Sequence, residues 1–356
     1  MIVRLGMFSL VLKNIKSFLK KLSPEQKKII AGILFFIVFI EYPLLVFQKE
    51  GKSFSITGDD ISFQKEKRLP KSPFSGAFCA RDGKRAIGVV FAEYPETMPL
   101  SGLSQADIVI EGPVANANGV NRLFAIFQCH LPKEVGSIRS VRPYVVDLAL
   151  GFDSVLTSWG GANQAVDRID LLNIDWLDGR ANPSGAFFRK INIPAPHNGF
   201  ASLSGLKRAV DNLNIRAANQ FKGYKFLSDD EIVYSAKKQS VEINDYLYPV
   251  KYIYNFKTGD YLRFWNGSEM IDRNTGRQIS VKNLVIMKTN IGVFSPGVVD
   301  IKIIGTGKAK IFQAGKEIKG TWEKKSAKDK LTFFSDKGKE IKFIPGQIWI
   351  EIVSEF

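Results

Sequence analysis

The sequence predicts an α/β or α+β amino-terminal domain and a mostly antiparallel β domain, both after one amino-terminal transmembrane helix. Three observations support this fold class. Residues 29–47 form one apolar run, residues 78–239 alternate short apolar runs with helix-like stretches, and residues 240–356 contain short strands separated by glycine turns. The chain has 356 residues and is 45% hydrophobic, which is enough for about two domains with real cores.

The apolar run 29–47 has the length of a membrane span. Its nineteen residues, at about 1.5 Å per residue, extend about 28 Å, close to the thickness of a hydrocarbon core. Glu41 and Pro43 lie near its outer end, where a charge and a proline cost little. A cleaved signal peptide is the alternative, but the preceding segment is long and no A-x-A site follows. We therefore expect an uncleaved anchor that attaches the protein to the membrane.

The basic residues are concentrated before this anchor. Residues 1–28 contain seven lysines and arginines and one acid, so they carry +6 of the net charge of +15. This asymmetry predicts a single-pass protein with a cytoplasmic amino terminus and an extracytoplasmic body. The remaining charge is dispersed and the compartment lacks nucleic acid, so we expect no nucleic-acid partner. Residues 48–77 are polar, contain Pro70 and Pro73, and are expected to form a tether.

The domain at 78–239 has strand-like and helix-like segments. Short apolar runs at 86–91, 106–110 and 123–127 predict strands. Apolar residues at helical spacing predict helices at 142–150 and 202–213, with Ser202 or Ser204 as the N-cap of the second.

The domain at 240–356 has the pattern of a β structure. Strands predicted at 252–256 and 261–265 flank a turn at Thr258-Gly259. Further strands are predicted at 298–304, 309–312, 317–322, 331–334, 341–344 and 347–353. Short strands at this spacing are typical of an antiparallel sheet or a small barrel.

The cysteines and histidines do not predict a metal site. His130 and His197 are far apart in the sequence, and no cluster of cysteines accompanies them, so we expect no metal and no cofactor. Cys79 and Cys129 would face an oxidising space, where they could form a disulfide or remain two buried thiols. The sequence does not decide between these alternatives.

The candidate functional residues lie between 107 and 198. Glu111 follows an apolar strand at its carboxyl end, where α/β sheets bind ligands. Arg139 and Arg142 open a predicted helix, so their guanidinium groups and the helix amides could bind a carboxylate, phosphate or sugar oxyanion. A structural ion pair between Glu111 and an arginine is the alternative. The other candidates for ligand binding are Arg122, Tyr144, Trp159, Asn163, Arg189 and Asn198.

Six strings in the chain resemble those of a known bacterial family. They match S-G-L-x-x-A-D-I-V-x-E, R-F/L-x-A-I-F/Y-Q, G-x-x-R-S-x-R before an aromatic residue, A-P-H-N, G-K-x5-W and F-x-P-G-x-x-W. The matching segments are 101–111, 122–128, 136–144, 195–198, 315–322 and 343–349. The chain resembles the YerB-like family of predicted lipoproteins, a two-part domain of unknown function, over roughly residues 83–353.

The sequence departs from the family pattern in two places. Family members commonly carry a lipobox cysteine, whereas neither cysteine here is near the apolar run, so a transmembrane helix is expected in place of the lipid. Between Glu111 and Arg122 the chain has a longer segment than the glycine-rich approach of the family. The resemblance implies an envelope location and a two-part fold, but no activity.

Two functions from different classes are compatible with these residues. The first is a membrane-anchored envelope module whose cleft binds an anionic cell-wall glycan or peptide fragment, or an envelope protein partner. The second is a cell-envelope hydrolase in which Glu111 or Asp107 acts as an acid or base with His197, and the glycines at 160–161 stabilise an oxyanion. We favour the first because no activated nucleophile or metal constellation is present in the sequence.

Overall fold

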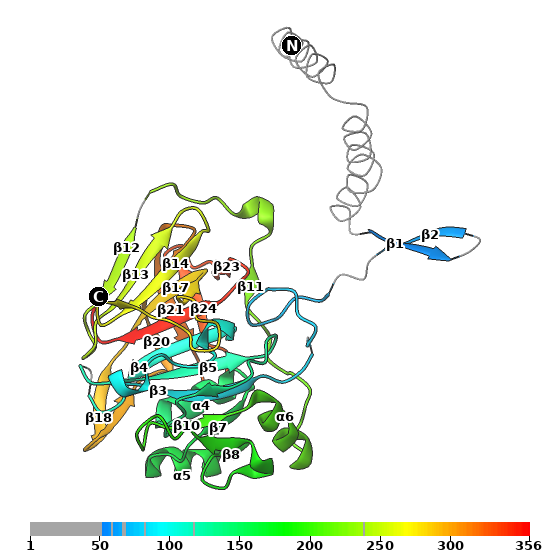
Figure 1. Cartoon of the computed structure of the whole chain (residues 1–356). Helices are drawn as coiled ribbons and strands as arrows, with labels where there is room; N and C mark the ends of the chain where they lie inside the picture. Colours follow the sequence, from blue (N-terminus) through cyan, green and yellow to red (C-terminus); the bar gives the residue numbers. More distant parts are fainter. Residues whose placement is uncertain (1–51, 58–59, 66–68, 82, 117, 238) are drawn as a thin grey trace, which may run out of the picture. The chain divides into compact units, whose positions relative to one another are not determined.

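The computed structural model describes residues 52–57, 60–65, 69–81, 83–116, 118–237 and 239–356. The chain divides into two compact units, 1–68 and 69–356, which are described separately. In the first, β1 (Lys52–Thr57) and β2 (Asp60–Lys65) form an antiparallel hairpin within the predicted tether (Figure 1). The predicted basic segment 1–28 and anchor 29–47 lie outside the described residues. Within the described ranges, no helix is long and apolar enough to cross a membrane.

The second unit is built on one ten-stranded sheet with the order β22-β21-β20-β17-β24-β4-β5-β3-β7-β8 (Figure 1). In chain order its strands are β3 (Ile87–Glu93), β4 (Ile108–Pro113), β5 (Asn121–Phe127), β7 (Val155–Ser158), β8 (Trp176–Asp178), β17 (Asn283–Lys288), β20 (Gly305–Gln313), β21 (Lys316–Lys324), β22 (Thr332–Ser335) and β24 (Ile348–Val353). The segments 78–239 and 240–356 each contribute half of them. The last strand, β24, lies between β17 and β4 and is parallel to both, so the two segments share a continuous sheet.

A smaller antiparallel sheet and one helix cover one face of the main sheet. The smaller sheet contains β12 (Ser240–Ile243), β13 (Val250–Asn255), β14 (Asp260–Trp265), β15 (Ser268–Glu269) and β16 (Ser280–Val281). Tyr252 and Trp265 of this sheet share a core with Val109 of the main sheet. The same core includes residues of helix α6 (Leu203–Asn212), whose N-cap Ser202 accepts a hydrogen bond from the Gly205 amide at 3.1 Å.

Helices α4 (Pro143–Gly151) and α5 (Asn163–Leu172) cover the opposite face. Val145 of α4 and Ile169 of α5 share a second core with Ile110 and Phe124 of the main sheet. Successive residues of a strand point to opposite faces. Ile110 therefore faces α4 and α5, whereas Val109 faces the smaller sheet.

The remaining elements are short. They are β6 (Val135–Gly136), β9 (Phe187–Arg189) and β10 (Gly199–Ala201) in one sheet, the hairpin β18 (Ile291–Ser295) and β19 (Val298–Ile301), the parallel pair β11 (Lys225–Phe226) and β23 (Lys342–Phe343), and 3-10 turns at Pro95–Thr97, Leu103–Gln105, Pro183–Gly185 and Asp229–Glu231. A disulfide joins Cys79 and Cys129, with 5.0 Å between their Cα atoms. Of the two alternatives for these cysteines, a disulfide or two buried thiols, the structure has the disulfide.

The predicted fold class is confirmed at the coarse level: the second unit is rich in sheet, has few helices, and its carboxyl-terminal strands are mostly antiparallel. The prediction for 347–353 was incomplete, because this strand, β24, pairs in parallel. Helix α5 was not predicted. Its N-cap is Ala162, which has no capping side chain, and only half of its ten residues are apolar.

Candidate functional site

The predicted site residue Glu111 belongs to a buried ion cluster. Arg263 of β14 donates through one terminal nitrogen to Glu93 at 2.8 Å and Glu111 at 2.7 Å, and through the other to Glu351 at 3.2 Å. All four side chains are fully buried. Glu111 and Glu351 are directly paired on the parallel strands β4 and β24. We name Glu93, Glu111, Glu351 and Arg263 the carboxylate cluster.

The carboxylate cluster has more negative groups than positive ones. Burial raises the pKa of Glu111 well above its usual value, Arg263 lowers it, and the neighbouring Glu351 and Glu93 raise it further. Arg263 comes from the smaller sheet and the glutamates from three strands of the main sheet, so the cluster ties the two sheets together. These contacts match the structural alternative considered for Glu111, and its partner Arg263 was not among the predicted residues.

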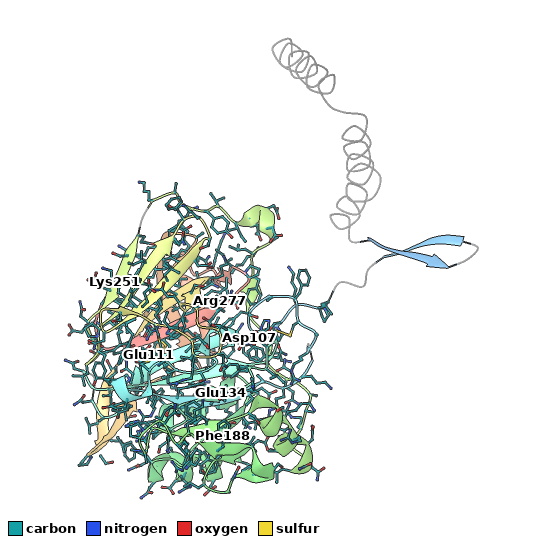
Figure 2. All side chains as sticks on the ribbon, in the orientation of Figure 1. Asp107, Glu111, Glu134, Phe188, Lys251 and Arg277 are labelled. Carbon is teal, nitrogen blue, oxygen red and sulfur yellow. A yellow bond between two sulfur atoms is a disulfide. The ribbon has the colours of Figure 1, made fainter. Side chains whose placement is uncertain are left out.

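Asp107 lies at the other end of β4 from Glu111, as Figure 2 shows. Its Oδ2 accepts hydrogen bonds from the amides of Gln128 at 2.8 Å and Cys129 at 3.1 Å, and its Oδ1 accepts one from the Ser75 hydroxyl at 2.5 Å. Both oxygens are therefore used to hold the segment beside the disulfide. Asp107 does not share a site with Glu111.

Arg122 and Glu111 lie on opposite faces of the main sheet. Gly112 of β4 is paired with Arg122 of β5, and Glu111 is paired with Leu123. Leu123 belongs to the core under the smaller sheet, so Arg122, its neighbour in the strand, points towards α4 and α5. The structure therefore does not form the predicted cleft that contained both Glu111 and Arg122. The reason is the register of β4 and β5, which sets the two residues one position apart.

Arg122 is buried without a carboxylate partner. Arg122 is only 2% exposed. It donates a hydrogen bond to the Asn121 carbonyl oxygen at 3.1 Å, and it also interacts with the Tyr94 side chain, which raises its pKa. Within the described ranges its Nε has no hydrogen-bond partner, and no carboxylate lies within 4.0 Å. The guanidinium lies 5.6 Å from the centre of the Tyr94 ring. Burial, together with the nearby Arg142, lowers the pKa of Arg122 to about 10. Buried charges are normally paired, so this arrangement is unusual.

Arg139 and Arg142 are close enough to Arg122 to lower its pKa through their positive charges. Each makes one long contact with a backbone oxygen, at 3.4 Å, to Pro196 and Val141 respectively. The Nε atom of each is buried and lacks a partner among the described residues. We name Arg122, Arg139 and Arg142 the arginine cluster. It gathers three guanidinium groups and has no acid paired with any of them in the described structure.

Two helices begin beside the arginine cluster. Arg142 is the N-cap of α4 and Ala162 that of α5; neither cap supplies a side-chain hydrogen bond, and neither first turn contains an acid. The segments that lead into the helices are paired, since Val141 bridges Gly161 and the Ala162 amide donates to the Val141 oxygen at 3.2 Å. The positive ends of both helix dipoles therefore lie near the cluster, where they favour an anion.

Aromatic and polar candidates lie around the cluster. The His197 ring lies 4.8 Å from the Tyr94 ring, and burial together with the charge of Arg139 lowers the pKa of His197. Arg189 stacks 4.3 Å from the Trp159 ring and donates to Asn198 Oδ1 at 2.6 Å. Burial lowers the pKa of Arg139, and the positive charge of the nearby Arg189 lowers it further. These residues form an outer rim rather than part of the buried cluster.

Two further candidates lie at the helix starts. Tyr144 is in the first turn of α4 and donates to the Gly112 oxygen at 3.3 Å; burial raises its pKa, which Arg122 and Arg142 oppose. Asn163 is the first residue of α5 and is exposed. The Gly160 amide donates to Asp178 Oδ1 at 2.9 Å, so it is not free to bind an oxyanion.

The structure therefore brings together the predicted arginines and their aromatic neighbours, but separates them from both predicted carboxylates. Tyr94 was missed, although an aromatic residue directly after a buried strand is a signal that could have selected it. Glu93, Glu351 and Arg263 were also missed. Charged residues inside otherwise apolar strands were the available signal.

Comparisons with known proteins agree with the fold. Residues 76–216 match the family model described as the DUF3048 N-terminal domain, a protein of unknown function, and residues 240–350 match its C-terminal domain. The chain is 31% identical over 278 residues to "Putative lipoprotein YerB" of Bacillus subtilis, covering 76% of this chain and 82% of that protein.

A solved structure is also similar. The crystal structure of the Bacillus subtilis YerB protein matches with a TM-score of 0.72 and 29% identity, covering 80% of this chain and 97% of that one. The resemblance inferred from the six sequence strings is thereby confirmed. This chain belongs to the DUF3048 family and is similar to the YerB protein.

Proposed function

We propose that this protein is an envelope binding module that holds an anionic ligand, a cell-wall fragment or an envelope partner, at its arginine cluster. The observation that carries the proposal is Arg122, a buried guanidinium with no carboxylate partner in the described structure. Burying an ion without a partner costs several kcal/mol. An anion would supply the missing charge and would accept the hydrogen bonds that the buried Nε atoms lack.

The surroundings of the cluster support the same proposal. Arg139, Arg142 and the starts of α4 and α5 add positive potential, and the first turns of both helices contain no acid. A structural arginine would instead resemble Arg85, whose side chain is 8% exposed and pairs with Asp153 and Asp175. The contrast indicates that Arg122 is arranged for a ligand rather than for the fold.

Three features support an extracytoplasmic location. Residues 29–47 have the composition of an anchor and follow a basic segment. Cys79 and Cys129 form a disulfide, which persists mainly in oxidising compartments. The relative from Bacillus subtilis is described as a putative lipoprotein.

The hydrolase hypothesis receives less support. Glu111 is held by Arg263, Asp107 is held by two amides and a hydroxyl, and the Gly160 amide is held by Asp178. Each of these three groups already has a hydrogen-bond or ion-pair partner, and the second oxygen of Glu111 accepts from Asn121 at 2.5 Å. We therefore prefer binding over hydrolysis.

The experiment is calorimetric titration of the full chain in nanodiscs with phosphate, citrate and muropeptides at constant ionic strength. We expect at least one anion to bind the native chain, and Arg122→Met to weaken that binding at least tenfold. Arg216→Met is the matched control, because Arg216 pairs with Asp153 away from the cluster. Equal binding by Arg122→Met and the native chain would refute the proposal.

A further inference from the structure

A groove begins at Pro143 and Tyr144, directly after Arg142 of the arginine cluster, and we propose that groove and cluster together bind one ligand: a phosphate ester with an apolar chain. The phosphate would lie at the arginine cluster and the chain along the groove. This inference rests on the proposed function and specifies the chemical class of its ligand.

One wall of the groove is a single face of α5. The groove has a volume of about 730 Å³, and α5 contributes Gln164, Asp167, Arg168 and Leu171. These positions are three or four residues apart and so share one side of the helix. Seven residues at 1.5 Å each correspond to about 10 Å of groove length. The groove therefore suits an extended ligand, starting from the end of α5 beside the arginine cluster.

The opposite wall comes from β18, β19 and the residues that follow them. It consists of Phe294, Ile301, Ile303 and Ile304, and the β18 hairpin and α5 lie at the same end of the molecule in Figure 1. Phe294 is 60% exposed and Leu171 on the facing wall is 77% exposed. Large apolar side chains thus flank the groove on both sides and are exposed to solvent. This lining favours an apolar occupant.

The charged groups of the groove are mostly neutralised or peripheral. Arg168 forms an ion pair with Asp147 at 2.6 Å, and Gln164 donates to Ser295 at 3.1 Å. Asp300 and Lys302 are exposed and flank the buried Ile301 in sequence, so they lie at the rim. The floor of the groove is left to apolar side chains.

Gly112 connects the groove to the arginine cluster. A Cβ atom at Gly112 would lie 3.1 Å from the Tyr144 hydroxyl and 3.5 Å from Ile301 Cδ1, and both of these residues line the groove. Gly112 is also the residue paired with Arg122 across β4 and β5. The groove therefore ends next to Arg122. At this end of the groove Tyr144 and Ile301 pack over Gly112, and Pro143 and Tyr144 directly follow Arg142.

The charge of the cluster favours a phosphate over a carboxylate. Arg122 remains protonated at neutral pH, because its pKa is about 10, so the three arginines carry three positive charges. A phosphate monoester carries about −1.5 to −2 at pH 7, whereas a carboxylate carries one negative charge. Its three terminal oxygens also match several guanidinium donors at once.

The test compares three probes by calorimetric titration of the full chain in nanodiscs, with empty nanodiscs as the blank. The probes are octyl phosphate, methyl phosphate and octanoate. We expect octyl phosphate to bind at least tenfold more tightly than methyl phosphate, because burial of two methylene groups is worth about tenfold. We also expect it to bind at least tenfold more tightly than octanoate, which has a similar chain and less charge.

Two variants test the contacts of the phosphate and of the apolar chain separately. Arg122→Met should weaken both phosphates at least tenfold, whereas Leu171→Asn should weaken octyl phosphate and leave methyl phosphate unchanged. Leu213→Asn is the matched control, because Leu213 is an exposed leucine at the end of α6, away from the groove.

The outcomes distinguish the inference from the proposed function. If octyl phosphate and methyl phosphate bind equally and both depend on Arg122, the inference that the groove holds an apolar chain is wrong, and the proposed anion site stands. If no probe binds, both fail. The inference would also be overturned if Arg122→Met or Leu171→Asn bound octyl phosphate as tightly as the native protein. A change of oligomeric state in Leu171→Asn would overturn it too, because a second copy of the protein would then be the occupant of the groove.

Discussion

Replacement of Arg263 by methionine should remove most of the stability of the second unit. Arg263 donates to Glu93, Glu111 and Glu351 and to the Tyr252 hydroxyl at 2.9 Å, all of them buried. Breaking one buried ion pair by removing a partner costs about 3–5 kcal/mol. Here one substitution leaves three carboxylates without their cation.

Protonation of the carboxylates left without Arg263 limits the loss of stability. At pH 7 the neutralisation of a carboxyl group with an ordinary pKa near 4.5 requires about 3.4 kcal/mol, from 1.36 kcal/mol per pH unit. Neutralising two of the three carboxylates would require about 7 kcal/mol, so we expect a loss of about 4–7 kcal/mol. Such a loss is comparable to the whole stability of many domains.

Urea unfolding followed by tryptophan fluorescence measures this loss. Trp349 is a local reporter, because the Arg263 guanidinium lies 4.5 Å from its ring. The loss should shrink when the pH is lowered from 7 to 5, because the orphaned carboxyl groups then bind protons at less cost. Arg273→Met is the control; Arg273 donates to the Pro99 oxygen, and we expect a loss of about 1 kcal/mol. A loss below about 1 kcal/mol for Arg263→Met would refute this account of the carboxylate cluster.

Three other predictions concern stability. Folding raises the pKa of Glu111, so the contribution of Glu111 to stability is present at low pH and is lost as pH rises through the folded-state pKa. Glu111→Gln should therefore flatten the pH dependence of the urea midpoint between pH 5 and 8. The disulfide closes a loop with a sequence separation of 50, and Cys79→Ser with Cys129→Ser should cost about 4 kcal/mol, measured by urea unfolding with and without reductant. Ser202→Ala removes the N-cap of α6 and should lower the unfolding free energy by about 1 kcal/mol, whereas Ser204→Ala, two residues further along in the first turn, should not.

Local patterns predicted the elements of the fold but not their pairing. The apolar runs at 86–91, 106–110 and 123–127 correspond to β3, β4 and β5, and Ser202 caps α6 as one of the two proposed residues. The position of β24 between β17 and β4 was not predicted. Parallel pairs join segments that are distant in sequence, so no turn or local alternation reveals them.

The grouping of the candidate residues also followed from the sequence only in part. Arg122, Arg139 and Arg142 do lie together, because two of them precede α4 and the third faces it from β5. Glu111 was assigned to the same cleft, but the register of β4 and β5 turns it to the other face. That register depends on the loop between the strands, whose geometry the sequence does not give. The partner of Glu111, Arg263, is 152 positions away.

The most direct test of the central claim is the unfolding free energy of Arg122→Met in buffer without multivalent anions and again with methyl phosphate, at equal ionic strength. If Arg122 is buried for a ligand, the variant should be about 1–4 kcal/mol more stable than the native chain without phosphate, because an apolar side chain replaces an unpaired buried ion. The variant should also lose the stabilisation that methyl phosphate gives the native chain. A variant that is less stable without phosphate, and that gains as much from methyl phosphate as the native chain does, would contradict the account.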